Sequence, residues 1–526
     1  MPAVNNPQQL KAPDRAEPGA EAEAQQPLPA QSSLQGLVNQ VAGYGVGTVV
    51  NRTIGIVVAC IYPILLSKDE YGRLDVIFSL TMLLGVLFAI GLDTALARFY
   101  YEQQEIQRRR QLVSTVFFVV MAITAAAVGI LLLVSKPLAL WLYGDLRYVP
   151  YFRLALVGMP FLMINSMQLL VLRLERRIRV FNVISAANLV TAAVIGISTI
   201  LIFHIGAAGV FVGYIAGNVV TGIVAMWINR HEMAFLPMRG EVKKLLNVGL
   251  PLTFSGTALW LIGYVNRPIL AHRVSADDVG LYAIASGAVG MIAMMLGAFR
   301  NAWQPFAFAI MGRRGSEIIY GHALTLFTSV AATVAVCAGL FASHGLLIIN
   351  AYTHKNWSGA AVVVGPLAMA TVFSGMYLMV QTGIYIAGRT SAIALTMGIG
   401  AAANLLFNFL LIPRLGILGA ACATSLGHLT ALIAIYTLAQ RLVPIPYQPG
   451  KLAIAIVSAV AVIGLSMQMQ AGSVVKDLAV KSGILVCYCG ILLATRTVTR
   501  SDLALFWNIH WPWRKPVPQE RPRAIS

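Results

Sequence analysis

The sequence predicts an all-α membrane protein with about fourteen transmembrane helices, arranged as two pseudo-symmetric six-helix lobes plus two C-terminal helices around a central cavity. Three observations support this class. The 526 residues are 58% hydrophobic and only 11% charged, with a mean hydropathy of +0.76, whereas a soluble protein carries about 25% charged residues. Apolar runs of about twenty residues, long enough to cross a bilayer, follow one another without the alternation of barrel strands. Markers of the first half of the chain recur in the second.

The apolar runs define the predicted helices and the division of the chain. Helices 1 to 6 are expected at 44–66, 74–97, 112–134, 151–172, 183–204 and 207–228. Helices 7 to 12 follow at 245–271, 280–304, 323–349, 360–387, 392–412 and 417–439, and helices 13 and 14 lie near 452–469 and 478–496. This division gives a tail at 1–33, an N-lobe at 34–229, a basic linker at 230–244, a C-lobe at 245–440, the last helix pair at 451–497 and a tail at 498–526.

The two tails and the loops fix the predicted orientation. Residues 1–33 are polar, with no apolar segment of a signal peptide, so we expect a disordered tail. The net charge of +18 comes from basic residues in every second loop, which is the pattern of membrane orientation rather than of nucleic-acid binding. Both termini are therefore predicted to be cytoplasmic. The basic loops contain Arg98, Arg108, Arg109, Arg110, Arg173, Arg176, Arg177, Arg179, Arg230, Arg239, Lys243, Lys244, Arg313, Arg314, Arg389, Arg441 and Lys451.

An internal repeat relates the two lobes. Ile205-Gly206-Ala207-Ala208-Gly209 and Leu415-Gly416-Ile417-Leu418-Gly419 lie 210 residues apart, and the pairs Pro63/Pro268, Gly72/Gly280 and Gly158/Gly365 lie 205 to 208 apart. Because each half has six helices, the second half starts on the same side as the first. The repeats are therefore expected to be parallel, related by an axis along the membrane normal.

The stretch Pro63–Glu102 is the most informative hairpin. We expect a sharp turn at Asp69-Glu70-Tyr71-Gly72 between helices 1 and 2, followed by an apolar run that carries Asp93 and ends on Arg98. A carboxylate inside a membrane span is costly to bury, so Asp93 is a functional candidate. Its counterpart in the second lobe is Pro268–Phe308, where the alignment places Arg300 opposite Asp93.

Charges within the spans are the candidate site residues. Arg52 is about 12 Å deep in helix 1, and Asp93 and Arg300 are each about 8 Å from the inner end of their helices, at 1.5 Å per residue. Arg267 lies near the outer end of helix 7. A cavity lined by Arg52, Arg267 and Arg300 suits an anionic substrate, because guanidinium binds phosphate in a bidentate way.

Plainer interpretations stay open for several of these residues. Arg52, Arg267 and Arg300 would then extend to the lipid headgroups. Asp93 and Arg98 are candidates for a coupling or gating charge, but Arg98 is also explained as an ordinary basic residue of the inner side.

The sequence indicates neither an enzyme nor a cofactor. The loops on the outer side are short, and no phosphate-binding loop, GxSxG elbow or HExxH motif is present. The cysteines lie inside apolar runs, and Cys487-Tyr488-Cys489 has no paired CxxC or nearby histidine, so no metal is expected.

The block LLSKDEYGRLDVIFSLTMLLGVLFAIGLDTALARFYYE resembles the hallmark of bacterial polysaccharide transporters, the lipid-linked oligosaccharide flippases of the multidrug/oligosaccharidyl-lipid/polysaccharide exporter superfamily. Glu70-Tyr71-Gly72 matches the turn of that family, and Gly91-Leu92-Asp93-Thr94-Ala95 with Arg98-Phe99 matches the end of its second helix. In the second lobe, Asp278-Val279-Gly280-Leu281-Tyr282 resembles the equivalent turn.

The resemblance implies an alternating-access transporter of the bacterial inner membrane. It would move an undecaprenyl-pyrophosphate-linked oligosaccharide to the outer leaflet for exopolysaccharide, capsule or O-antigen synthesis, with a polysaccharide polymerase and export machinery as partners. Arg52, Asp93, Arg267 and Arg300 fall on the helices that line the cavity in that family. The alternatives are a multidrug/cation antiporter of the same superfamily and a membrane polysaccharide polymerase or ligase.

Overall fold

A computed structural model describes residues 50–51, 53–103, 105–234, 239–311, 315–389, 391–469 and 473–497. The side chains of residues 239, 255, 295–298, 300–302, 305 and 309 lie outside this description. Within the described ranges the chain is helical, with turns and short 3₁₀ segments between the helices. The predicted tails, 1–33 and 498–526, fall outside those ranges.

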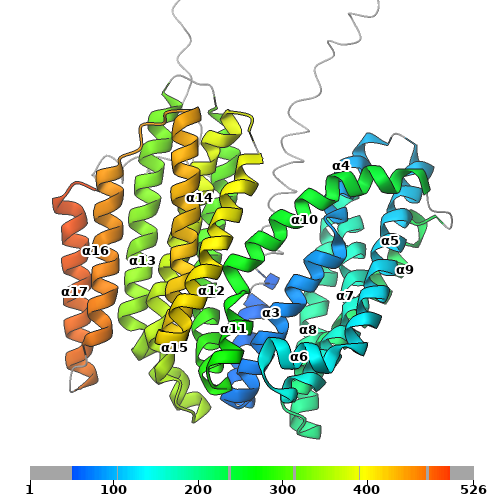
Figure 1. Cartoon of the computed structure of the whole chain (residues 1–526), viewed down its shortest axis with the longest axis horizontal. Coiled ribbons are helices and arrows are strands. Elements are labelled where there is room, and N and C mark those ends of the chain that lie inside the picture. Colours follow the sequence, from blue (N-terminus) through cyan, green and yellow to red (C-terminus); the bar gives the residue numbers. More distant parts are fainter. Residues whose placement is uncertain are drawn as a thin grey trace, which may run out of the picture.

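The first half of the chain forms helices that cross the molecule in alternating directions (Figure 1). An apolar helix over Thr53–Leu65 precedes them. The labelled helices are α3 (Lys68–Ala89), α4 (Leu92–Glu102), α5 (Ile106–Leu133), α6 (Ser135–Tyr143), α7 (Val149–Leu174), α8 (Ile178–Phe203) and α9 (Ala207–Ile228), with 3₁₀ turns η1 (Leu146–Tyr148) and η2 (Arg230–Glu232).

The second half repeats this plan and adds two helices. It comprises α10 (Val242–Tyr264), α11 (Asn266–Arg273), α12 (Ala276–Ala309), α13 (Ser316–Thr353), α14 (Ala361–Ile386), α15 (Ser391–Leu442), α16 (Pro449–Gln468) and α17 (Val474–Ala494), with 3₁₀ turns η3 (Arg239–Glu241) and η4 (Ser358–Ala360).

The predicted class, an all-α membrane protein, is confirmed. Twelve helices of the described part are long and apolar enough to cross a membrane. Two features connect this number with the fourteen predicted spans: Thr53–Leu65 is a shorter apolar helix, and α15 contains two helices joined at Gly416. Two predicted spans are also broken in the structure, because helix 2 is α3 plus α4 and helix 7 is α10 plus α11.

The sharp turn predicted at Asp69-Glu70-Tyr71-Gly72 is wrong, because these residues form the first turn of α3. The chain reverses just before them. Ser67 caps the helix: its Oγ accepts from the Glu70 backbone N–H at 3.2 Å, and Glu70 Oε2 accepts from the Ser67 N–H at 3.0 Å. This reciprocal arrangement is a capping box, and Ser followed three residues later by Glu is its sequence signature. The polar run is therefore a helix start that looks like a turn.

The repeated glycine corners adopt the same unusual backbone conformation. Gly206 has φ 55° and ψ −137°, and Gly416 has φ 56° and ψ −129°. This region is essentially restricted to glycine, since a side chain would collide with the backbone. Each corner is followed three residues later by a glycine that approaches the preceding helix: Gly209 faces Ile200 and Gly419 faces Leu411. The repeat seen in the sequence therefore specifies one structural corner twice.

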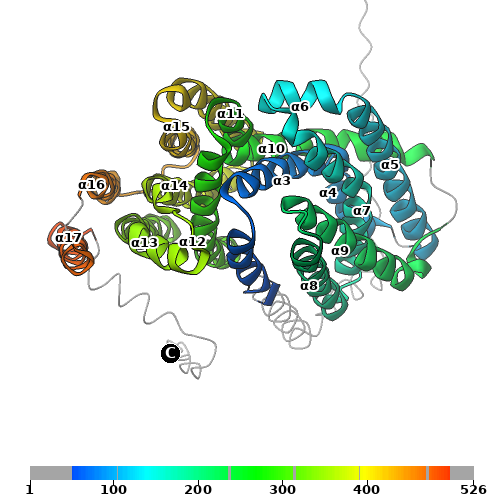
Figure 2. The same ribbon diagram turned by 90° about the horizontal axis from the view of Figure 1, so that it is seen from below.

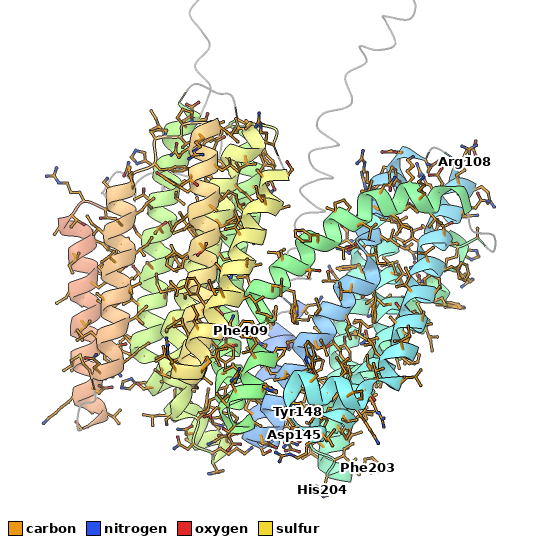
Figure 3. All side chains as sticks on the ribbon, in the orientation of Figure 1. Arg108, Asp145, Tyr148, Phe203, His204 and Phe409 are labelled. Carbon is orange, nitrogen blue, oxygen red and sulfur yellow. The ribbon has the colours of Figure 1, made fainter. Side chains whose placement is uncertain are left out.

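The helices form two lobes that meet at one end (Figures 1 and 2). The N-lobe contains α3 to α9, the C-lobe contains α11 to α15, and α10 crosses between them; α16 and α17 stand beside α13. The lobes touch at the lower end in Figure 1 and diverge toward the upper end. Arg108 lies at the upper end, and Asp145, Tyr148 and His204 lie at the lower end (Figure 3). The loop that contains Arg108, one of the basic loops predicted to face the cytoplasm, therefore lies at the upper end.

The Gly416 corner yields a prediction about stability. Gly416→Ala should lower the thermal stability of the detergent-solubilised protein, because a non-glycine residue in this conformation costs about 1–3 kcal/mol. Overlap with more distant residues is not the cause, since the nearest such atom to a new Cβ is Val274 Cγ1 at 3.8 Å. Gly398→Ala is the matched control, because Gly398 is helical with nothing within 4 Å of a new Cβ. Equal melting temperatures for the two variants would contradict this account.

Candidate functional site

A charge pair joins the two lobes near their lower end. Arg267 Nε, on α11, lies 3.0 Å from Asp75 Oδ2, on α3. The arginine side chain is 6% exposed and the aspartate side chain 27%. Asp75 is the eighth residue of α3, about 10 Å from its start at 1.5 Å per residue. Asp75 therefore lies within a helix long and apolar enough to cross a membrane, where a charge needs a partner. Arg267 lies on the short helix α11, which follows the candidate span Val242–Tyr264.

The C-lobe holds the guanidinium of Arg267 in place. Nη1 donates to the Gly263 carbonyl at 2.8 Å and to Asn266 Oδ1 at 3.0 Å. The rings of Tyr264 and Tyr282 lie 4.7 and 5.3 Å from Cζ, within the range of cation–π attraction. Since α10 ends at Tyr264 and α11 starts at Asn266, the helix break presents these groups around the arginine. Arg267 therefore belongs structurally to the C-lobe, and its ion pair reaches the N-lobe.

Asn266 extends this polar centre deeper into the C-lobe. Its Nδ2 donates to the Tyr282 hydroxyl and to Thr424 Oγ1, the latter at 3.0 Å. All three residues are buried. Leaving one of these buried polar groups without its hydrogen-bond partner typically costs about 1–3 kcal/mol. The geometry around Arg267 is therefore tightly specified.

A lysine of the C-lobe holds the end of the first helix, and a neighbouring tryptophan contacts the start of α3. Lys355 Nζ donates to the carbonyls of Pro63, Ile64 and Leu66 at 3.0, 2.9 and 2.6 Å. Carbonyls at a helix C-terminus lack partners within the helix and attract cations. Trp357 is fully buried, and its ring meets Tyr71 edge-on at 6.0 Å. Partial burial lowers the pKa of Lys355, and the nearby Glu70 carboxylate opposes this shift.

Two glycines of the repeat allow the lobes to touch. A Cβ on Gly72 would collide with the Ala276 carbonyl and lie 2.7 Å from the Gly280 nitrogen, and a Cβ on Gly280 would collide with the Lys68 carbonyl. The first turns of α3 and α12 therefore cross backbone to backbone. Both turns begin with the same cap, since Ser275 Oγ accepts from the Asp278 N–H at 3.1 Å as Ser67 does from Glu70. We call these contacts the lower interface: Leu66, Tyr71, Gly72 and Asp75 with Arg267, Gly280, Lys355 and Trp357.

Helix α10 connects the lobes over most of its length. Trp260 Nε1 donates to the Ser79 carbonyl at 2.6 Å, the backbones of Gly249 and Gly91 are in close contact, and Lys244 Nζ lies 4.4 Å from the Phe99 ring centre. The break between α3 and α4, with Ile90 and Gly91 at positive φ, lies at this crossing. Helix α10 therefore follows α3 and α4 from the lower interface toward the upper end.

The structure describes some of the predicted site residues and leaves others outside its description. Arg267 is buried against Asp75, and so does not extend toward lipid headgroups here. Asp93 lies in the first turn of α4, with Thr94 Oγ1 at 3.5 Å, and Arg98 is exposed, 3.7 Å from Glu102. Arg300 lies on α12, with its side chain outside the description, and Arg52 lies outside the described residues. The pairing of Asp93 with Arg300, and the substrate roles of the three arginines, stay predictions.

Sequence reasoning missed Asp75, Lys355 and Trp357. It treated Asp93 as the one clear carboxylate within a span, although Asp75 lies within the apolar run predicted for helix 2. The available signal was the pair of opposite charges, Asp75 and Arg267, each close to the outer end of its predicted span. Lys355 lies in a loop, and nothing in its local sequence indicates contact with residues about 290 positions earlier.

The structure is that of a helical membrane protein whose two lobes meet at one end, and its sequence assigns it to a family. The chain belongs to the polysaccharide biosynthesis protein family, whose model matches residues 37–311.

Solved structures share the fold. The lipid II flippase MurJ in an inward closed conformation superimposes with a TM-score of 0.68 at 12% identity, over 86% of this chain and 99% of that one. An inward-facing multidrug resistance transporter of the MATE family has a TM-score of 0.62 at 15% identity, over 74% and 94%. A membrane protein of Methanocaldococcus jannaschii, MJ1068, is 24% identical over 201 residues, which cover 36% of this chain and 38% of that protein.

The glycine contact yields a prediction about the lower interface. Gly72→Ala should separate the first turns of α3 and α12, because the colliding atoms are backbone and cannot rotate away. The change is measured as faster maleimide labelling of a Leu66→Cys probe, which is fully buried in the structure. Gly85→Ala on the same helix is the control, since its nearest neighbour is the flexible Met163 Cε at 3.7 Å. Unchanged labelling in Gly72→Ala would refute the close contact.

Lys355 can be tested with the same probe. Lys355→Met should also speed labelling of Leu66→Cys, because three helix-terminal carbonyls lose a charged donor, and such bonds contribute about 1.5–3 kcal/mol each before solvent exposure reduces them. Lys136→Met, at an exposed lysine of the lower end, should leave the rate unchanged. A rate in Lys355→Met equal to that in Lys136→Met would show that the lysine does not hold the interface.

Proposed function

We propose that this protein transports undecaprenyl-pyrophosphate-linked oligosaccharide units across the bacterial inner membrane, from the cytoplasmic to the outer leaflet. The observation that carries the proposal is the lower interface. Family membership indicates polysaccharide synthesis, and two lobes that touch at one end, with α10 crossing between them, have the arrangement that alternating access requires. The basic upper end would face the cytoplasm, together with both termini. In this state the lobes diverge toward the side from which the substrate comes.

Alternating access follows from how the contacts are distributed. Lys355 and Arg267 bind the N-lobe through charged hydrogen bonds. Each of these bonds is either formed or broken, so the lobes have two distinct states. Rocking of the lobes would break this set and bring the upper ends together. Two states that differ in a few such bonds can exchange when the substrate binds one of them better. The energy would come from an ion gradient or from removal of the product outside.

The proposed substrate roles concern the arginines. Arg52 and Arg300 would bind the pyrophosphate, and Asp93 would pair with an arginine in one of the two states. Arg98 would contribute to gating at the upper end. Guanidinium suits a diphosphate because its paired N–H groups match two phosphate oxygens. A polysaccharide polymerase and export machinery would use the product.

The arginine roles are tested by surface polysaccharide in a strain that lacks the chromosomal gene. Arg52→Ala and Arg300→Ala should each reduce export roughly 10- to 100-fold, the equivalent of one charged hydrogen bond of about 1.5–3 kcal/mol. The Lys variants should retain part of it. Arg414→Ala, at an exposed position of the lower end, is the control. Full export by properly inserted Arg52→Ala and Arg300→Ala would eliminate the proposed roles.

The fold shared with MATE transporters makes a multidrug antiporter the second candidate. It requires that deletion of the gene sensitises cells to cationic drugs and leaves surface polysaccharide intact. The proposed function requires the opposite pattern, together with accumulation of lipid-linked oligosaccharide on the cytoplasmic side. The two phenotypes separate the candidates without further structural assumptions.

A further inference from the structure

The charge pair of the lower interface is asymmetric in its anchoring. Besides its ion pair, Arg267 has two hydrogen bonds from Nη1 and two ring contacts. One of each is to the end of α10, at Gly263 and Tyr264, and one of each is to the C-lobe, at Asn266 and Tyr282. Its ion pair with the other lobe is made by Nε to Asp75. When the lower interface opens, the arginine must therefore stay with the C-lobe while the carboxylate leaves with the N-lobe.

Separation would leave a cation in a site built for an ion pair. The guanidinium is 6% exposed, and the surrounding residues Tyr264, Asn266 and Tyr282 are neutral. A buried charge that loses its partner is strongly unfavourable unless another counter-ion takes its place. The side chain of Asp75 is 27% exposed, so solvent reaches the ion pair from the side of the carboxylate.

We propose that Asp75 is a positioning residue that occupies an anion site on Arg267, and that the diphosphate of the transported lipid exchanges with it. This inference rests on the proposed function, because that function supplies the diphosphate. With the diphosphate on Arg267, the C-lobe keeps its counter-ion as the lobes part, so opening of the lower interface is coupled to the presence of substrate. Without substrate, Asp75 keeps that end closed.

The exchange couples binding of the diphosphate to opening of the lower interface. A ligand shifts an equilibrium between two conformations only by its difference in affinity for them. The diphosphate competes with Asp75 in the closed state and meets no such competitor in the open state, so its affinity differs in the required direction. Replacing Asp75 with a neutral residue removes the competitor and should remove most of the coupling.

The test measures the distance between spin labels on the two lobes at the lower end. Labels at Leu146→Cys and Leu415→Cys, both exposed in the structure, are placed in the full chain with its five native cysteines replaced by serine. Farnesyl diphosphate is the probe, and farnesol is the neutral control. In the otherwise native protein, farnesyl diphosphate should increase the ratio of long to short separations roughly fivefold or more, and farnesol should not.

Variants then assign the effect to the pair. Asp75→Asn should show the longer separations before any probe is added, and respond little to farnesyl diphosphate. Asp75→Glu, which keeps the charge, should respond as the parent does, and serves if Asp75→Asn is too unstable to study. Arg267→Gln should lose the response. Asp69→Asn is the matched control, because Asp69 pairs with Arg73 on the same helix and not across the lobes.

The results separate this inference from the proposed function. An equal response to farnesyl diphosphate in the parent and in Asp75→Asn overturns the exchange, as does a full response in Arg267→Gln. If gene deletion abolishes surface polysaccharide but farnesyl diphosphate does not change the spin-label separations, the proposed function stands and the exchange of Asp75 with the diphosphate is rejected. If gene deletion leaves surface polysaccharide normal but farnesyl diphosphate changes the spin-label separations in a way that depends on Asp75, the exchange stands and the proposed function is rejected.

Discussion

The ion pair between Asp75 and Arg267 is the constraint on which the arrangement of the two lobes depends. A charge inside a membrane-spanning helix, such as Asp75 in α3, is tolerated when it is paired, and here the two members of the pair belong to different lobes. The pair therefore stabilises one relative position of the lobes rather than the fold of either lobe. The glycines at the crossing of α3 and α12 permit this position, and Lys355 with Trp357 extends it to the end of the first helix.

The internal repeat explains why the lobes meet where they do. The same Ser cap followed by an acidic residue and a glycine starts α3 and α12, and the two copies pack against each other. One sequence pattern thus supplies both surfaces of the contact. The charges break the symmetry: the first copy leads into Asp75, whereas Arg267 precedes the second. The two copies of the repeat form the contact between the lobes. The difference between the copies, Asp75 after one and Arg267 before the other, adds an ion pair that can break when the lobes separate.

The fold was largely predictable from sequence, and the site was predictable only in part. Apolar run length identified most spans, and the glycine spacing identified the corners at Gly206 and Gly416, because glycine has a local conformational requirement there. The turn at Asp69–Gly72 was misjudged because a capping box and a turn use the same polar residues. Asp75 and Lys355 were missed for a different reason. Their partners lie 192 and about 290 residues away. The signal for Asp75 was an opposite charge near the outer end of a distant span, and the local sequence around Lys355 contains no signal for its contacts.

The most direct test of the account is a double-mutant cycle on transport, with Asp75→Asn, Arg267→Gln and the combined variant assayed for surface polysaccharide at equal membrane levels. If the two side chains act as one interaction across the lobes, each single variant leaves an uncompensated group and the double variant is no worse than either single one. The coupling should reach about 0.5–3 kcal/mol, as expected for residues in contact. Losses that simply add in the double variant would contradict the claim that this pair controls the contact between the lobes.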